Sequence, residues 1–222
     1  MRIARPLTFM LLAGSAVLLA ACPDTGASFD DFAARYEEIN PGTSSSSGVS
    51  ACEVPIADDA EVTGDWLFTL SARLDPKQAF VLNASITAEL QMDGTMLVDM
   101  TLVPLSADDQ MTPVACPAIT FEDLLVNADG TFAWLLAEDT AGLTLGGAAN
   151  PISGGDILTG LAISGTICGG ATAGFVCGPV TGKVTTPIPN FDLTGSTYTI
   201  QKISGAPPAP VINCDKVPAE YM

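Results

Sequence analysis

Apolar residues recur at every second position through most of residues 62–203, which is the spacing of β-strands with one buried face. The clearest run, over residues 80–92, has seven apolar residues on one face. Asp93-Gly94 follows it, and such a pair between two alternating runs predicts a β-hairpin. Asp129-Gly130 predicts a second hairpin in the same way.

The alternating runs together predict an all-β fold. Eight or nine strands with only short helical patches are typical of an antiparallel barrel or, failing that, of a β-sandwich. We favour an up-and-down barrel. The expected strands cover residues 64–74, 80–92, 96–102, 119–126, 132–136, 157–168, 175–186 and 196–203, with a short one near 143–145.

The first 22 residues have the three-part layout of a secretory signal. Arg2 and Arg5 precede an apolar stretch over residues 7–21, which is shorter than the ~20 residues that a bilayer-spanning helix needs. The stretch ends in Leu19-Ala20-Ala21-Cys22. The sequence therefore predicts export and removal of residues 1–21.

Leu19-Ala20-Ala21-Cys22 resembles the lipobox of bacterial lipoproteins. The resemblance implies that the Cys22 thiol is acylated, that the chain is cut before it, and that the lipid holds the protein on a membrane. Pro23 stands where an aspartate would favour the inner membrane, so the resemblance implies the outer membrane of the cell envelope. The whole layout is similar to uncharacterised envelope lipoproteins of Gram-negative bacteria.

Four segments follow from this pattern. Residues 1–21 form the signal peptide, and residues 22–61 form a lipid-anchored tether with a short amphipathic helix near residues 29–39 and a Ser-rich linker. Residues 62–204 form the β domain. Residues 205–222 form a Pro-rich, extended tail that cannot join a central strand.

Composition excludes several classes of function. The chain has 222 residues, 25 acidic and 8 basic side chains, a net charge of −17 and no histidine. Without histidine there is no His-dependent catalytic triad and no His metal ligand. An acidic surface repels phosphates, so we expect no nucleic-acid partner. The expected partners are a membrane, contacted through the lipid, and an envelope protein or a small apolar ligand.

Five cysteines remain besides Cys22, and the exported compartment favours disulfides. Cys168 and Cys177 flank a Gly-rich connection between two expected strands, so we expect a bridge there. Cys52 and Cys214 lie at the two ends of the β domain and form the second expected pair, with Cys116 left over. A zinc site is not expected, because the chain has no Cys-x-x-Cys pair.

Gly64-Asp65-Trp66 at the start of the first strand resembles the Gly-x-Trp of lipocalins, in which the tryptophan closes one end of a barrel. The C-terminal arginine of that family has no evident counterpart. The resemblance favours a barrel interior that holds a small apolar ligand, and a solid core is the alternative. The candidate lining residues are Trp66, Phe68, Phe80, Leu82, Ile86, Leu90, Met96, Met100 and Trp134.

No residue is identified as catalytic, and no cofactor or metal is expected. Adjacent carboxylates occur at four places, Asp58-Asp59, Asp108-Asp109, Glu122-Asp123 and Glu138-Asp139. Neighbours on a strand point to opposite faces, so no such pair forms a hydrolytic site by itself. We therefore predict a non-enzymatic, lipid-anchored β-barrel. The alternatives are a structural or protein-interaction lipoprotein with a solid core and, more remotely, a carboxylate-dependent hydrolase.

Overall fold

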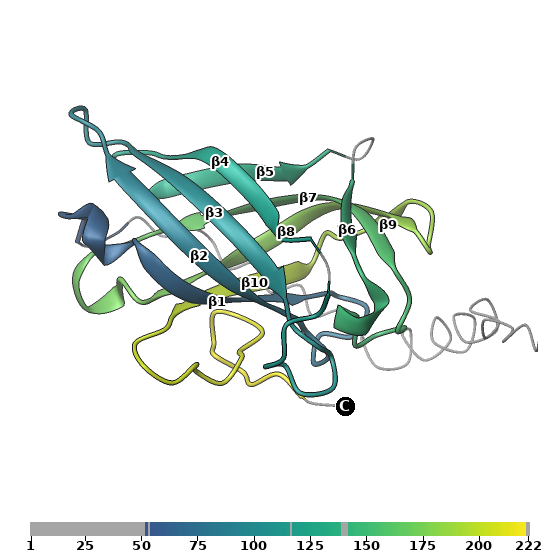
Figure 1. Ribbon diagram of the computed structural model, residues 1–222. Coiled ribbons are helices and arrows are strands. Elements are labelled where there is room, and N and C mark those ends of the chain that lie inside the picture. Colours follow the sequence, from purple (N-terminus) through teal and green to yellow (C-terminus); the bar gives the residue numbers. More distant parts are fainter. Residues whose placement is uncertain (1–51, 53, 116, 139–141, 221–222) are drawn as a thin grey trace, which may run out of the picture.

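The computed structural model describes residues 52, 54–115, 117–138 and 142–220 (Figure 1). The predicted signal peptide, lipobox and amphipathic helix lie outside these residues, as does Cys116. The strands are β1 (Gly64–Ser71), β2 (Phe80–Leu90), β3 (Met96–Pro104), β4 (Ile119–Val126), β5 (Thr131–Ala137), β6 (Leu143–Leu145), β7 (Ile157–Thr166), β8 (Phe175–Thr186), β9 (Phe191–Asp192) and β10 (Ser196–Lys202). Three short 3-10 helices are η1 (Asp59–Glu61), η2 (Gly147–Ala149) and η3 (Gly170–Thr172).

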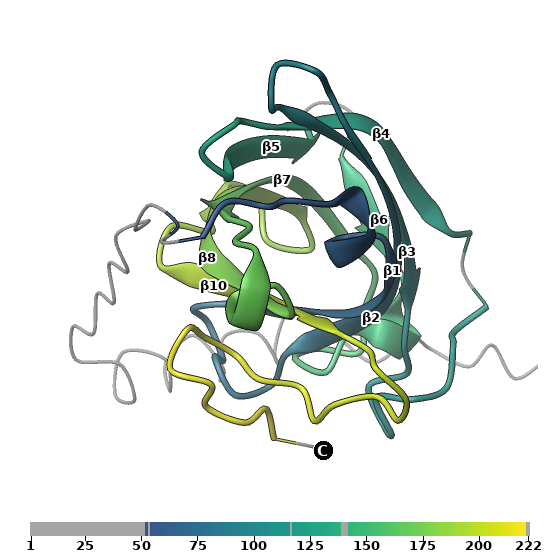
Figure 2. The same ribbon diagram turned by 90° about the vertical axis from the view of Figure 1, so that its left-hand side faces the viewer.

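The strands form one antiparallel sheet in the order β4-β3-β2-β1-β10-β8-β7-β5. The first strand of the chain pairs with the last, and every other neighbour follows in chain order except where β6 and β9 intervene. Figure 2 shows these eight strands arranged in a ring. The predicted all-β antiparallel barrel is confirmed.

The ring is nearly closed between β4 and β5. The two strands are joined through the Asp129-Gly130 hairpin, where the amide of Asn127 donates to the carbonyl of Thr131. The indole Nε1 of Trp134 on β5 donates to the Leu125 carbonyl on β4 at 2.8 Å. The β4–β5 junction is thus held at its hairpin end and by one side chain.

Apolar side chains at every second position of the strands point inward and fill the barrel. On β2 and β3, Ile86 and Met100 lie opposite each other and both point inward, whereas their polar neighbours Thr87 and Asp99 lie on the outside. The largest side chains that are fully buried in the central core are Trp66, Phe68, Met96, Met100, Leu102, Ile163, Tyr198 and Ile200.

Two glycines make room for the buried ring of Tyr198. A Cβ atom on Gly165 would collide with the phenol oxygen of Tyr198, and one on Gly178 would lie 3.1 Å from its ring. The phenol donates to the Ser164 carbonyl at 3.1 Å, so the polar group is satisfied inside the core. Burial raises the pKa of Tyr198, which keeps it neutral.

The outer face of β1 and β10 is covered by residues 204–220, which we call the C-terminal strap (Figure 1). Thr199 is fully buried beneath it and donates to the Val211 carbonyl at 2.7 Å, and Thr197 donates to the Ile212 carbonyl at 2.6 Å. Val211 and Ile212 are themselves buried. The predicted extended tail is therefore packed against the barrel wall.

Four predicted cysteines form two disulfides, but the predicted pairing is wrong. Cys52 pairs with Cys168, and Cys177 pairs with Cys214. Cys177 alternates with buried Val176 on β8 and so points outward toward the strap, whereas Cys168 lies beyond the end of β7. The two cysteines of the hairpin face different surroundings, and each fastens a different terminal segment.

Candidate functional site: the barrel interior and its two ends

Residues 54–63 close one end of the barrel, which we call the N-terminal end. Figure 2 looks onto this end and shows η1 lying across it. Val62 is buried, and its carbonyl accepts a hydrogen bond of 2.8 Å from the indole Nε1 of Trp66. Asp58 caps η1 by accepting from the Ala60 amide, a bond that lowers the pKa of Asp58.

Lys202 joins this closure from the last strand. Its Nζ donates to the carbonyls of Ala60 at 3.1 Å and of Glu61 at 2.6 Å, and it lies 5.6 Å from the centre of the Trp66 ring. Lys202 lies directly opposite Trp66 in the β1–β10 register. A lysine thus covers the tryptophan of the Gly-x-Trp motif, although the sequence pattern predicted no cation there.

The Cys52–Cys168 disulfide fastens the entering chain to the same end. The Gly169 amide donates to the Val54 carbonyl at 2.9 Å next to it. The N-terminal end is therefore closed by directional hydrogen bonds, a cation over an aromatic ring and a covalent bond.

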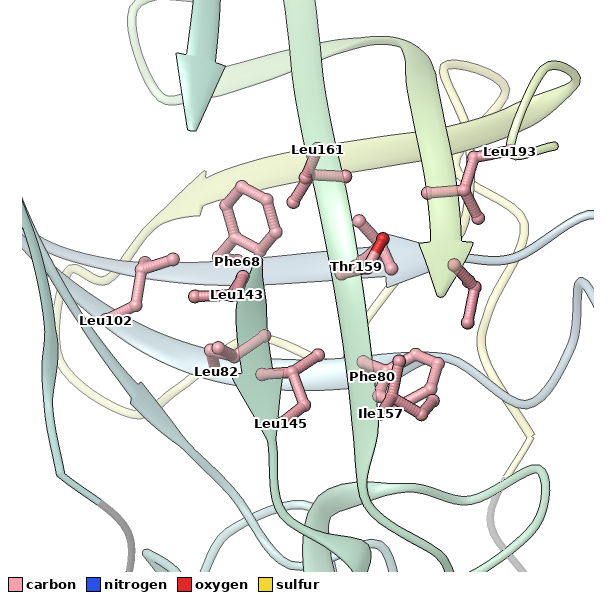
Figure 3. A pocket seen from close by; sticks show the side chains of 12 residues that line it. Phe68, Phe80, Leu82, Leu102, Leu143, Leu145, Ile157, Thr159, Leu161 and Leu193 are labelled. Atoms are coloured by element: carbon pink, nitrogen blue, oxygen red, sulfur yellow. The ribbon is translucent and has the colours of Figure 1, made fainter. Parts of the chain in front are cut away.

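The opposite end, which we call the β6 end, is closed by apolar side chains. β6 pairs with the same edge of β7 as β5 does, with Leu143 opposite Thr159 and Ala137 opposite Leu161. β6 thus continues β5, and it places the buried side chains of Leu143 and Leu145 over the barrel interior (Figure 3).

An interior cavity of about 40 Å³ lies behind these side chains (Figure 3). Its lining is Phe68, Leu70, Phe80, Leu82, Leu102, Leu143, Leu145, Ile157, Thr159, Leu161, Val184 and Leu193. The hydroxyl of Thr159, the single polar side chain in this set, lies 3.0 Å and 3.1 Å from the carbonyls of Gly160 and Lys183, so it is satisfied by the wall.

The nine predicted lining residues divide into three groups. Phe68, Phe80 and Leu82 line the cavity. Trp66, Ile86, Met96, Met100 and Trp134 are buried elsewhere in the core, where the Trp134 ring stacks on Phe132 at 4.1 Å. Leu90 is 38% exposed and does not line this cavity, because β2 ends at this residue.

The cavity is small against the ~300 Å³ of an ordinary ligand pocket. A space of about 40 Å³ holds a few water-sized groups at most, and its apolar lining does not favour water. The interior of the described barrel is therefore a packed core with a small void near the β6 end.

The predicted carboxylate pairs lie apart from one another on turns and outer surfaces. Asp109 accepts from the amides of Met111 and Thr112 in a loop, and Asp123 on β4 places its amide against the carboxylate of Asp99. Hydrogen bonds from Thr112 lower the pKa of Asp109. The partner of Glu138 in its pair, Asp139, lies outside the described residues. Within the described chain, no three acidic or cysteine side chains converge where they could hold a metal ion.

The few cations of the described chain mainly fasten segments to the barrel. Lys77 forms an ion pair of 2.6 Å with Glu220 of the strap, and Lys216 of the strap lies 4.7 Å from the Phe175 ring centre. Arg73 donates to the Thr194 carbonyl at 3.2 Å. These contacts connect the strap and loops to the wall.

The outer wall carries a groove of about 360 Å³ across β5, β7 and β8. Its floor follows the cross-strand neighbours Leu135, Ala162 and Thr181. Leu135 is 61% exposed beside it. Among the described residues, no helix is both long enough and apolar enough to cross a bilayer.

In comparisons with known proteins, the chain matches no protein-family model, no curated protein and no solved structure. The interpretation of its function therefore depends on the sequence and on the geometry described above.

Proposed function

We propose that the protein is a lipid-anchored, non-enzymatic lipoprotein of the cell envelope whose rigid β-barrel acts through its outer surface as a structural or protein-interaction module. The anchor is acylated Cys22, implied by Leu19-Ala20-Ala21-Cys22. Two or three acyl chains suffice for stable attachment to a bilayer. Pro23 favours the outer membrane in this proposal.

The observation that carries the proposal is the filled interior. The largest side chains of the barrel pack against one another, and the void beside them measures about 40 Å³. A barrel without room for a ligand acts through what its surface presents. The surface of this barrel is acidic, and most of the cations in the described chain contact carbonyls or rings of the protein itself.

The disulfides support an exported location. Disulfides persist in oxidising compartments and are rare in the cytosol. Cys52–Cys168 and Cys177–Cys214 fasten both terminal segments to the barrel, which suits a body that is held outside the cytoplasm on a chain of about 30 residues after Cys22.

Binding of a small apolar ligand is the second candidate function, and the lining of the interior cavity favours it. Eleven of its twelve side chains are apolar, and Leu143 and Leu145 of β6 are among them. A ligand would need these side chains to move. Denaturing extraction of protein purified from membranes, followed by mass spectrometry, tests this candidate: a stoichiometric apolar molecule supports it, and an empty extract contradicts it.

Replacement of the anchoring cysteine tests the main proposal. In the native host, Cys22→Ser should move the exported protein from the membrane fraction to the soluble fraction, because no acyl chain then holds it. Cys116→Ser is the matched control and should leave the protein in the membrane fraction. Membrane residence of the Cys22→Ser variant at the wild-type level would contradict the lipid anchor.

A further inference from the structure

The groove on the outer wall is hollow because its strands carry small residues there. Ala137, Ala162 and Gly182 lie on neighbouring strands, and a Cβ atom on Gly182 would collide with the Gly160 carbonyl oxygen. The exposed side chain of Leu135 borders this hollow. The result is a groove with an apolar part, formed by Leu135, Ala137, Leu161 and Ala162, and a polar part, formed by Glu138 and Thr181.

The chain enters the barrel close to the strands that carry this groove. Cys52 is bonded to Cys168, two residues beyond the end of β7, and its Sγ lies 3.3 Å from the Ile167 carbonyl oxygen. A Cβ atom on Gly130, just before β5, would lie 3.0 Å from the same sulfur. The entry point is therefore beside the start of β5 and the end of β7, at the N-terminal end of the barrel.

The length of chain before Cys52 matches the distance to the groove. Six residues separate Cys168 from Ala162, which is ~20 Å along a strand. The linker over residues 40–51 spans up to ~40 Å when extended. The amphipathic segment over residues 29–39 is ~16 Å long as a helix. The segment can thus lie along the groove while Cys52 stays in its disulfide.

The apolar positions of the segment match the apolar part of the groove lining. Phe29, Phe32, Tyr36 and Ile39 recur at helical spacing, and the acids of the same segment lie between them. Lys183, next to Gly182, is exposed but lies opposite Asp192 in the β8–β9 register. Because Glu138 lines the groove, apolar contacts with Leu135 rather than charge pairing would hold the segment, and its acids would face solvent.

We propose that residues 29–39 dock as an amphipathic helix in the groove formed by β5, β7 and β8. The occupant is this chain's own tether, and docking shortens the free connection between Cys22 and the barrel to residues 23–28. The lipid-bearing end of the chain is then held against one wall of the barrel, which fixes the side of the barrel that faces the membrane. Docking does not depend on acylation of Cys22.

Hydrogen–deuterium exchange of the exported chain, residues 22–222 with both disulfides intact, tests this docking. We expect amides of residues 30–39 to exchange about tenfold or more slower than in an unstructured peptide. Leu135→Ser in the groove and Phe32→Ser in the segment should each remove this protection. Leu125→Ser is the matched control, because Leu125 is 50% exposed on β4 outside the groove, and it should leave the protection unchanged.

Three results would overturn the proposal. Unprotected amides over residues 30–39 in the wild-type chain would exclude docking. Protection that survives Leu135→Ser in a folded variant would place the segment elsewhere. Protection that falls on dilution, together with a dimer in sedimentation, would show that a second copy occupies the groove. Because Phe32→Ser leaves the barrel sequence intact, its result stands even where Leu135→Ser fails to fold.

Discussion

The two ends of the barrel are closed by different kinds of interaction. At the N-terminal end, Trp66 bonds to Val62, Lys202 bonds to η1, and Cys52–Cys168 fastens the entering chain. At the β6 end, apolar side chains of β6, β7 and the β9 region meet around a void of about 40 Å³. The same barrel wall thus supports a locked end and a loosely packed end.

The β6 end has more freedom to move than the N-terminal end. Hydrogen bonds and disulfides require one geometry, whereas apolar contacts tolerate small shifts. A void also lacks contacts on one side of its lining, which lowers the cost of rearranging that lining. Local opening should therefore begin at the β6 end.

Truncation of the buried tryptophan should have the largest effect. Trp66→Ala removes a 1% exposed side chain and the bond to Val62 from the locked end, and it should cost about 3–5 kcal/mol of unfolding free energy. Urea denaturation of the oxidised protein measures this. Met92→Ala, at a fully exposed position, is the control and should change stability by less than ~0.5 kcal/mol. A Trp66→Ala loss as small as the control would show that the N-terminal end is not locked.

Removal of the disulfides should rank next. Cys52→Ser with Cys168→Ser opens a link across 116 residues, and Cys177→Ser with Cys214→Ser opens one across 37 residues. Each should cost ~2–4 kcal/mol, with the longer link worth ~1 kcal/mol more by chain entropy. Urea midpoints of the two double variants give the order. A larger loss of stability on removing Cys177–Cys214 would contradict this order and would show that the strap disulfide stabilises the barrel more than the one at the N-terminal end.

The same enlargement should have opposite effects at the two ends. Val98→Ile adds a methylene at a fully buried site on β3 near the N-terminal end and should cost ~1–3 kcal/mol. Val184→Ile adds the same group beside the void and should be neutral or stabilising by ~0.5 kcal/mol. Thermal unfolding of both variants is the measurement. Equal losses would mean that the β6 end is as tightly packed as the N-terminal end.

Lys202, the cation over the Trp66 ring, should contribute less to the free energy of unfolding than the disulfides do. Lys202→Met keeps the apolar stem but removes the bonds to Ala60 and Glu61, and it should cost about 1 kcal/mol. Lys202→Arg retains a cation and should recover part of this loss. Exchange of the Val62 and Thr63 amides, followed by mass spectrometry, reports whether η1 loosens. Unchanged exchange of these amides in Lys202→Met would show that Lys202 does not stabilise the closure of the N-terminal end.

Acid should weaken the turns only slightly and only below the ordinary range of aspartate. Hydrogen bonds from the following threonine lower the pKa of Asp93, Asp129 and Asp192 from 3.8. A lowered pKa in the folded state means that the stabilisation is fully present above the ordinary pKa and is lost as the pH falls through the lowered pKa. The wild type should therefore have a higher free energy of unfolding than Asp129→Asn at pH 6, and this difference should be smaller at pH 3. A gap that widens at pH 3 would contradict these bonds.

Local sequence pattern predicted the wall of the barrel well. The limits of β4, β6 and β8 agree with the predicted strands, because each element is an alternating run between turn residues. The turns at Asp93-Gly94 and Asp129-Gly130 were predicted from two residues each, and both aspartates accept from the threonine two positions later. The alternating pattern predicted strands that were too long, to Leu74 and Met92, whereas β1 ends at Ser71 and β2 at Leu90. A residue beyond the last hydrogen-bonded pair of strand residues can continue the pattern without being buried.

Contacts between distant segments were not predictable in this way. The cysteine pairing depends on which terminal segment reaches the outward face of Cys177, and spacing along the chain does not contain that information. Lys202 was missed because its role appears only when β10 pairs with β1. Gly165 and Gly178 are within strands. A glycine is needed at both positions because the Tyr198 ring of β10 packs against them, and this contact is not visible in the sequence.

Native mass spectrometry of the protein purified from membranes of its native host most directly tests the central claim that a lipid anchor presents a solid, disulfide-braced barrel. We expect a chain that begins at Cys22, is heavier by its acyl groups and lighter by the four hydrogens of two disulfides, and retains no molecule noncovalently. An unmodified Cys22, or a small molecule retained at one copy per chain, would contradict it.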